Sequence, residues 1–123
     1  IPGQEYDDDG FAMALARAYN NWLAEFCQYC PERLFGACMT IPHDIEAMVS
    51  EIRRTKRELG FKGLYIRPNQ VRGRNWHDRC YDVLWETCQE EDMTVGFHGG
   101  MNCTLPQAVA EMEMQTSASK RNA

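Results

Sequence analysis

Residues 58–69 read ELGFKGLYIRPN, and this stretch decides the fold. Gly60 is the residue type that most often ends a helix in a left-handed conformation. The short apolar run at 63–66 that follows is typical of a buried strand. The polar triplet at 67–69 then ends that strand in a loop. The stretch therefore predicts a helix, a short strand and a loop in direct succession.

Outward from this stretch, the same unit recurs on both sides. Apolar runs near 34–40, 63–67 and 94–98 each follow a helical pattern, at a spacing of about 30 residues that is typical of βα units. Such crossovers make parallel, right-handed connections. A complete (β/α)8 TIM barrel needs about 250 residues. We therefore predict an α/β chain whose residues 1–123 form the central portion of a partial barrel; the alternative is a small, complete doubly wound domain.

Helical periodicity predicts the elements between the strands. We expect helices near 9–29, from Asp44 to Gly60, near 78–91 and near 105–114, with a loop at 1–7 and a frayed tail at 115–123. The first helix is predicted to bury one apolar stripe, which consists of Phe11, Leu15, Ala18, Trp22 and Phe26. Trp22, Tyr81 and Trp85 are expected in the core. The basic cluster Arg53, Arg54, Lys56 and Arg57 is interpreted as a solvated helix face.

Composition excludes several classes of protein. Apolar residues make up 44% and charged residues 25%, as in globular chains. The net charge of -5 argues against a general nucleic-acid binder. No apolar run approaches the ~20 residues of a membrane helix, and no secretory signal is visible. We expect a cytoplasmic protein that binds neither nucleic acid nor membranes.

Two residues at predicted strand ends carry useful chemistry. His98 precedes two glycines at the end of the third strand, where a neutral imidazole can bind a metal. Arg67 ends the second strand, where its guanidinium suits a substrate carboxylate. A histidine bonded to a backbone carbonyl and an ordinary ion pair are the structural alternatives. His43 and His77 precede helices and are interpreted as structural.

The six cysteines are interpreted mostly as reduced, buried thiols. Cys27 and Cys30 form a C-x-x-C motif, but the motif ends a helix and has no second pair at zinc-ligand spacing. Phosphate-binding glycine motifs and the serine-hydrolase elbow are absent from the sequence.

Four stretches together resemble a known family. They are YNNWLAEFC (19–27), PERLFGACMTIPHD (31–44), ELGFKGLYIRPN (58–69) and YDVLWETCQEEDMTVGFHGG (81–100). In this order they look like the amidohydrolase-related metal-dependent enzymes (amidohydrolase 2), in particular the branch of aminocarboxymuconate-semialdehyde decarboxylase. The resemblance implies a (β/α)8 barrel with a divalent metal, zinc or alternatively manganese.

By this resemblance, His98 matches a histidine metal ligand at the end of the fifth barrel strand. Arg67 and Asn69 match an RPN segment and are candidate substrate-binding residues. The family's H-x-H pair, a later histidine and an aspartate ligand are absent from this sequence. The implied function is a hydrolase or carboxy-lyase of the decarboxylase type, acting on a small carboxylated substrate, with a homo-oligomer possible. A non-catalytic half-barrel interaction module and a small C-x-x-C zinc or redox domain are the alternatives.

Overall fold

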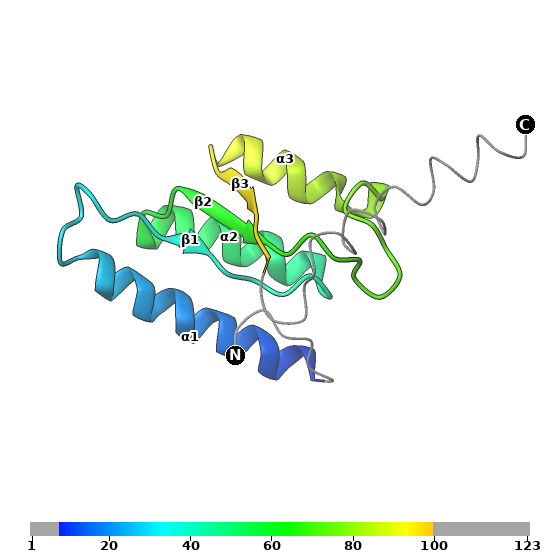
Figure 1. Ribbon diagram of the computed structural model, residues 1–123, viewed down its shortest axis with the longest axis horizontal. Helices are drawn as coiled ribbons and strands as arrows, with labels where there is room; N and C mark the ends of the chain where they lie inside the picture. Colours follow the sequence, from blue (N-terminus) through cyan, green and yellow to red (C-terminus); the bar gives the residue numbers. More distant parts are fainter. Residues whose placement is uncertain (1–7, 100–123) are drawn as a thin grey trace, which may run out of the picture.

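Three parallel strands form the centre of the protein (Figure 1). They are β1 (Ala37–Cys38), β2 (Gly63–Ile66) and β3 (Thr94–Phe97). The structure is a computed structural model that describes residues 8–99. The sheet order β1-β2-β3 follows the chain, and Gly63 pairs with Ala37 on one side and Thr94 on the other. The predicted parallel α/β topology is confirmed.

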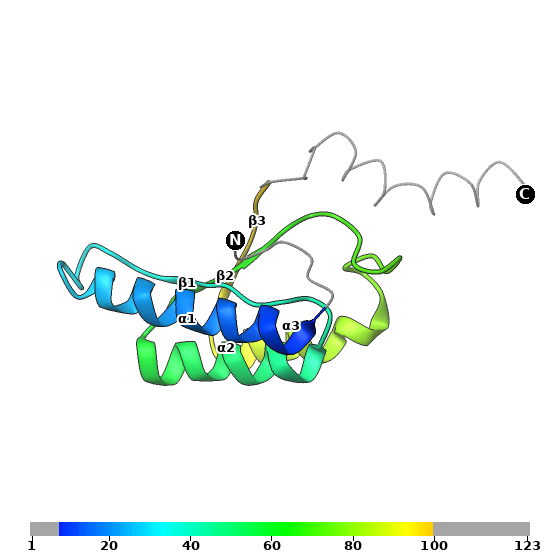
Figure 2. The same cartoon turned by 90° about the horizontal axis from the view of Figure 1, so that it is seen from below.

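The helices lie on one side of this sheet (Figure 2). They are α1 (Asp9–Cys27), α2 (Ile45–Leu59) and α3 (Asp82–Glu90), the last preceded by a 3₁₀ turn, η1 (Arg79–Tyr81). A doubly wound domain carries helices on both faces of its sheet, whereas a barrel carries them only outside. The one-sided arrangement therefore matches a segment of a barrel and not a complete doubly wound domain.

The boundaries of α2 follow the sequence signals. The Asp44 side chain accepts a hydrogen bond of 2.9 Å from the Ala47 N–H and caps the helix, and Gly60 ends it with φ of 71°. The apolar stripe of α2 meets β2 and α3 in the main core. That core includes Met48, Ile52, Phe61, Leu64, Tyr81 and Leu84.

The prediction for the buried face of α1 is wrong. Phe11, Trp22 and Phe26 are 57%, 54% and 55% exposed. The residues that α1 buries are instead Ala12, Ala16, Asn20, Ala24 and Cys27. All five are small or short, so they let the helix backbone approach the sheet and α2 closely. Trp22 is therefore not a core residue.

The first strand is shorter than the apolar run near 34–40, and it is not buried on both faces as a strand inside a fully covered parallel sheet would be. β1 is two residues long and Ala37 is exposed. Because the described helices cover one face of the sheet, alternate residues of β1 and β2 are buried, whereas β3 contains no buried residue. Cys38 points toward the helices and is completely inaccessible to solvent.

The basic cluster of α2 is not simply solvated. Arg54 binds Glu51 within α2 at 2.7 Å, and the Glu51 side chain is 3% exposed. Arg57 binds Glu91, which lies just after α3, and Arg53 binds Glu90 at 3.3 Å. The cluster therefore joins α2 to α3 as well as facing water.

The third predicted helix begins with a separate turn. The Asp78 side chain accepts a hydrogen bond from the Cys80 N–H at 2.9 Å and caps η1. Tyr81 is buried as predicted, and Trp85 is half-buried against the core. The predicted loop at 1–7, helix at 105–114 and tail at 115–123 lie outside the described residues. Among residues 8–99, no helix is long and apolar enough to cross a membrane.

Candidate active site

The carboxyl ends of β1 and β2 open onto a small cavity of about 30 Å³. Arg67 and Asn69, the two candidate substrate-binding residues, both line it. The complete lining consists of Thr40, Pro42, Met48, Tyr65, Ile66, Arg67, Asn69, Gln70, Val71 and Trp76. This volume suits about one water molecule and not a substrate. The carboxyl ends of parallel strands are where α/β folds place their ligands.

The loop that carries Arg67 and Asn69 is folded back on itself. Val71 and Arg74 exchange backbone hydrogen bonds of 2.9 Å around a tight turn. The two residues between them, Arg72 and Gly73, have positive φ angles of 48° and 78°, as a type I′ turn requires. Trp76 Nε1 then donates to the Arg67 carbonyl at 2.8 Å and closes the loop.

A second contact holds this loop from outside. Arg72 forms an ion pair of 2.7 Å with Asp9 at the start of α1. The loop between β2 and α3 is thereby attached to the helix that precedes β1. Both ends of the cavity wall, at Arg67 and at the turn, are fixed by hydrogen-bonded partners.

Two amides in this loop have buried atoms without hydrogen-bond partners in the part of the chain that the structure describes. They are Asn69 Oδ1 and both side-chain polar atoms of Asn75, a residue that is 4% exposed. Native proteins pair nearly all buried polar atoms with protein, water or ligand groups. These amides therefore mark a place for an ordered water or a polar ligand group. No motif in the sequence indicated that Asn75 would lie there.

His98 is the first residue after β3, at the carboxyl end of the strand that pairs with β2. Its N–H donates to the Ile66 carbonyl at 2.9 Å, so the sheet pairing fixes its backbone. Its Nδ1 contacts the Gly99 carbonyl, which can only accept a hydrogen bond. A proton on Nδ1 satisfies this contact, and in that tautomer Nε2 keeps its lone pair for a ligand.

The side chain of Tyr65 connects His98 to the cavity. The two rings lie 5.9 Å apart, and Tyr65 also lines the cavity beside Arg67. Tyr65 pairs with Gly96, two residues before His98, so these residues share the helix-free face of the sheet. In a barrel that face is the interior. The sequence analysis did not single out Tyr65.

A divalent ion fits His98 only as one of several ligands. A catalytic zinc site needs about three protein ligands and an open position. Within residues 8–99, no group of three or more His, Cys, Asp and Glu side chains is placed to hold an ion. The described part of the chain therefore contains no complete metal centre.

The C-x-x-C motif does not form a site in the described residues. Cys27 is buried and Cys30 is half-buried at the end of α1, and both thiols are free. The Cys30 thiol donates to Glu32 at 3.0 Å, and this hydrogen bond raises the pKa of Cys30. A raised pKa disfavours the thiolate that redox and zinc chemistry require.

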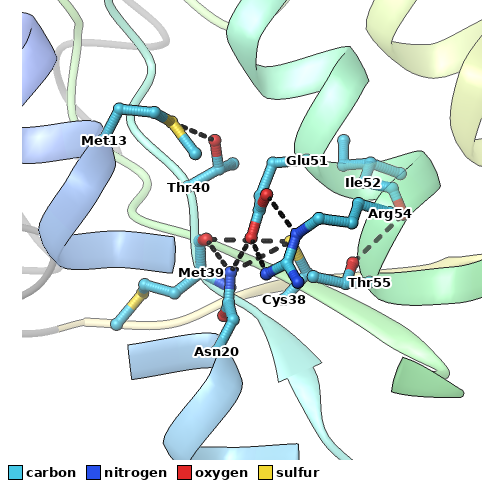
Figure 3. A network of polar contacts seen from close by, with 9 residues as sticks. All are labelled: Met13, Asn20, Cys38, Met39, Thr40, Glu51, Ile52, Arg54 and Thr55. Atoms are coloured by element: carbon cyan, nitrogen blue, oxygen red, sulfur yellow. Dashed lines mark hydrogen bonds and ion pairs between the residues drawn. The ribbon is translucent and has the colours of Figure 1, made fainter. Parts of the chain in front are cut away.

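A buried polar network lies beneath the end of β1 (Figure 3). Asn20 donates to the Met39 carbonyl at 2.7 Å and to Glu51 at 2.9 Å, and it accepts from the Met39 N–H at 2.8 Å. Arg54 binds both carboxylate oxygens of Glu51. The network fixes the backbone immediately before Thr40, which lines the cavity. A single Asn within an apolar helical pattern was its only signal in the sequence.

Burial alone would raise the pKa of Glu51. The hydrogen bonds from Arg54 and Asn20 outweigh that effect, and the net result is a pKa below the ordinary value. Glu51 is therefore ionised at neutral pH and serves as the acceptor at the centre of the network.

Comparison with known proteins places these features in a family. A family model described as amidohydrolase matches residues 3–119. The curated decarboxylase orsB of Emericella nidulans is 31% identical over 100 residues. The match covers 80% of this chain and 30% of that protein.

Two solved structures of 5-carboxyvanillate decarboxylase from Novosphingobium aromaticivorans match as well. One, a mutant with bound manganese and 3-methoxy-4-hydroxy-5-nitrobenzoic acid, has a TM-score of 0.74 at 32% identity, covering 94% of this chain and 32% of that one. The other, a complex with manganese and the same nitrobenzoic acid, has a TM-score of 0.71 at 31% identity, covering 90% and 30%. The present chain thus spans about a third of the length of these relatives.

Proposed function

Because this chain belongs to the amidohydrolase family, we propose that it is part of a metal-dependent carboxy-lyase that removes carbon dioxide from a small carboxylated aromatic substrate. One observation carries the proposal: the Arg67 and Asn69 cavity and the His98 imidazole lie on one edge of the sheet, joined by Tyr65. The related decarboxylases support the choice of carboxy-lyase over hydrolase.

His98 is assigned as one metal ligand through Nε2, and the remaining ligands come from outside residues 8–99. When bound, the ion supplies a positive charge that orients the substrate and stabilises negative charge in the reaction. Manganese is the ion in the two related structures, whereas imidazole is a ligand well suited to zinc. The identity of the ion is therefore part of the test.

Arg67 is assigned to a substrate carboxylate. Its guanidinium can form two parallel charge-assisted hydrogen bonds with such a group. The Trp76 bond to the Arg67 carbonyl holds the backbone, so that only the side chain adapts to the substrate. Asn69 adds an amide whose buried oxygen requires a donor, such as a phenol hydroxyl or a water.

The decisive experiment uses the intact protein that contains this segment, stripped of metal and reloaded with Zn²⁺ or Mn²⁺. Released carbon dioxide is measured on a set of hydroxybenzoates with a second carboxyl group, and esters and amides of the same acids serve as hydrolase substrates. Metal-dependent carbon dioxide release, weakened in Arg67→Ala through a raised KM, supports the proposal. Hydrolysis without decarboxylation, or no turnover with either ion, contradicts it.

A further inference from the structure

The strands carry one large side chain on the face of the sheet that the described helices leave open. Val95 packs against the core on the helix side, so its neighbours in β3 face the other way. The strand residues on that open face are, by the pairing register, Ala37, Gly63, Tyr65, Thr94 and Gly96. Tyr65 is the single aromatic residue among them. In a barrel, side chains from this face meet in layers inside the barrel, and Tyr65 therefore shapes the interior along these three strands.

The ring of Tyr65 adjoins both candidate site residues. Tyr65 pairs with Gly96, yet its ring lies 5.9 Å from the ring of His98, two residues further along the chain. It also lines the cavity together with Arg67, two residues further along its own chain segment. Diagonal contacts of this kind lie within reach of an aromatic side chain. The ring therefore leans toward the carboxyl end of the sheet, where the proposed chemistry takes place.

Gly96 leaves open space beside this ring. A Cβ added at Gly96 would meet no heavy atom of residues 8–99 nearer than the Leu64 carbonyl, at 3.8 Å. Gly96 itself is exposed on the open face. The layer beneath the candidate site thus combines one aromatic ring with one position that has no side chain.

A substrate that reaches both candidate site residues lies over this layer. Ile66 pairs with Phe97, so the next residues, Arg67 and His98, follow each other across the two strands. Neighbouring strands lie about 4.8 Å apart. A molecule with its carboxylate at Arg67 and its other end near an ion on His98 therefore spans β2 and β3, directly above Tyr65 and Gly96.

We propose that Tyr65 is a specificity-determining residue: the aromatic ring of the substrate packs against the Tyr65 ring, in the space that Gly96 leaves open. This inference rests on the proposed function for the positions of the carboxylate and the ion. Aromatic pairs gain stabilisation beyond the area that they bury, and a saturated ring does not. Tyr65 therefore selects aromatic acids over saturated acids of the same size, and the selection depends on its ring and not on its hydroxyl.

The alternative role for Tyr65 is to hold His98 in place. His98 has its own anchors, because its N–H donates to the Ile66 carbonyl and its Nδ1 contacts the Gly99 carbonyl. The two rings are tilted by 45°, so the imidazole does not stack face to face on Tyr65. This geometry favours a role toward the substrate.

The test measures binding by titration calorimetry in the intact protein that contains this segment, loaded with Mn²⁺. The aromatic probe is 4-hydroxy-3-methoxy-5-nitrobenzoic acid, which is bound in one related structure, and cyclohexanecarboxylic acid is the saturated probe. Tyr65→Leu should weaken the aromatic probe by about 3- to 10-fold, whereas Tyr65→Phe should stay within about 2-fold of the parent. The saturated probe should bind equally to all three proteins. Thr94→Ala, on the same face but further from the site, is the control.

Gly96→Ala keeps the test decisive if Tyr65→Leu does not fold. Its methyl group enters the space assigned to the substrate ring, so the aromatic probe should bind about 10-fold more weakly. Elemental analysis of the same samples should show unchanged bound metal in every variant.

Three results would overturn the inference. They are parental affinity for the aromatic probe in both Tyr65→Leu and Gly96→Ala, an equal loss for both probes in Tyr65→Leu, and a loss of metal in Tyr65→Leu that accounts for its weaker binding. Carbon dioxide release by the parent, measured in parallel, separates the two proposals. Release together with unchanged affinities contradicts the role of Tyr65 alone, and ring-dependent binding without release contradicts the proposed reaction alone.

Discussion

The carboxamide of Asn20 pairs with both backbone polar groups of Met39, at 2.7 and 2.8 Å. Asn20 lies in the middle of α1 and is completely buried. Met39 is the first residue after β1. The Asn20 side chain thus makes with Met39 the hydrogen bonds that a neighbouring strand would make. It thereby determines where the chain leaves the sheet, one residue before the cavity-lining Thr40.

Replacing Asn20 by Ala should destabilise the protein more than any surface change on α1. The substitution removes the amide partner of both the Met39 N–H and the Met39 carbonyl, and it removes one of the two hydrogen bonds that Oε1 of Glu51 accepts. We expect the free energy of unfolding to fall by about 3 kcal/mol. Urea denaturation measures this fall in the free energy of unfolding. The neighbouring Asn21→Ala is the control, and equal losses in both variants would refute the role of Asn20.

The Glu51 network should make stability depend on pH. Because the folded-state pKa of Glu51 is lowered, its contribution is complete above the ordinary carboxyl pKa and is lost as pH falls through the folded value. Glu51→Gln should therefore be much less stable than the parent at pH 7, and the difference should shrink below about pH 4. Urea titrations at each pH measure the free energy of unfolding of the variant and of the parent. The exposed Glu86→Gln is the control variant, and a difference between Glu51→Gln and the parent that is constant with pH would contradict this.

Gly36 should not tolerate a side chain. A Cβ at this position would lie 2.3 Å from the ring of Phe61, which is itself buried. We expect Gly36→Ala to cost about 2 kcal/mol of unfolding free energy through overpacking. Gly96→Ala is the matched control in the same sheet, because within residues 8–99 its Cβ would meet nothing nearer than the Leu64 carbonyl at 3.8 Å.

The double variant Gly36→Ala with Phe61→Leu gives a specific check on that steric cause. Removing the ring should recover part of the loss, so the two substitutions should be less than additive. Strict additivity would show that the ring is not the obstacle.

In the intact protein, His98→Ala and Arg67→Ala should have different effects. Loss of His98 removes one of the few bonds that hold the ion, so bound metal should fall below half and turnover by at least about 100-fold. Arg67→Ala should keep its metal and raise KM by about 10- to 100-fold. Elemental analysis and steady-state kinetics separate the two, with the exposed His77→Ala as control. Full metal in His98→Ala would remove His98 from the site.

The 123-residue chain by itself should have no decarboxylase activity. Its described residues provide no three-ligand metal centre, and one imidazole binds an ion weakly. Carbon dioxide release should therefore equal the buffer control, with either Zn²⁺ or Mn²⁺ added. Turnover that a chelator abolishes and metal restores would contradict this expectation.

Much of the fold could be predicted from local signals in the sequence. Asp44 and Gly60 bound α2 as expected, because capping and left-handed geometry depend on single residues. The parallel order of the strands followed from their even spacing. These features need no information about distant contacts.

Periodicity failed where the neighbours of an element decide its orientation. Two apolar stripes compete on α1, one of large aromatic residues and one of small residues. The large stripe is the more hydrophobic of the two, yet the small one faces the core, because close packing against the neighbouring elements favours Ala and Asn20 there. The Asn20–Glu51 contact and the Tyr65–His98 contact join different elements, so no local pattern could predict them.

The order of the sheet has a consequence for how the chain acquires its structure. Each strand pairs with its neighbour in sequence, from Ala37 to Gly63 and from Gly63 to Thr94. Every pairing therefore closes a chain loop of similar, moderate length, and the entropy lost at each closure is nearly the same. During synthesis, β1, α2 and β2 can associate before β3 has been translated. Folding can then proceed in steps from the amino to the carboxyl end, each step adding one helix and one strand to an existing edge.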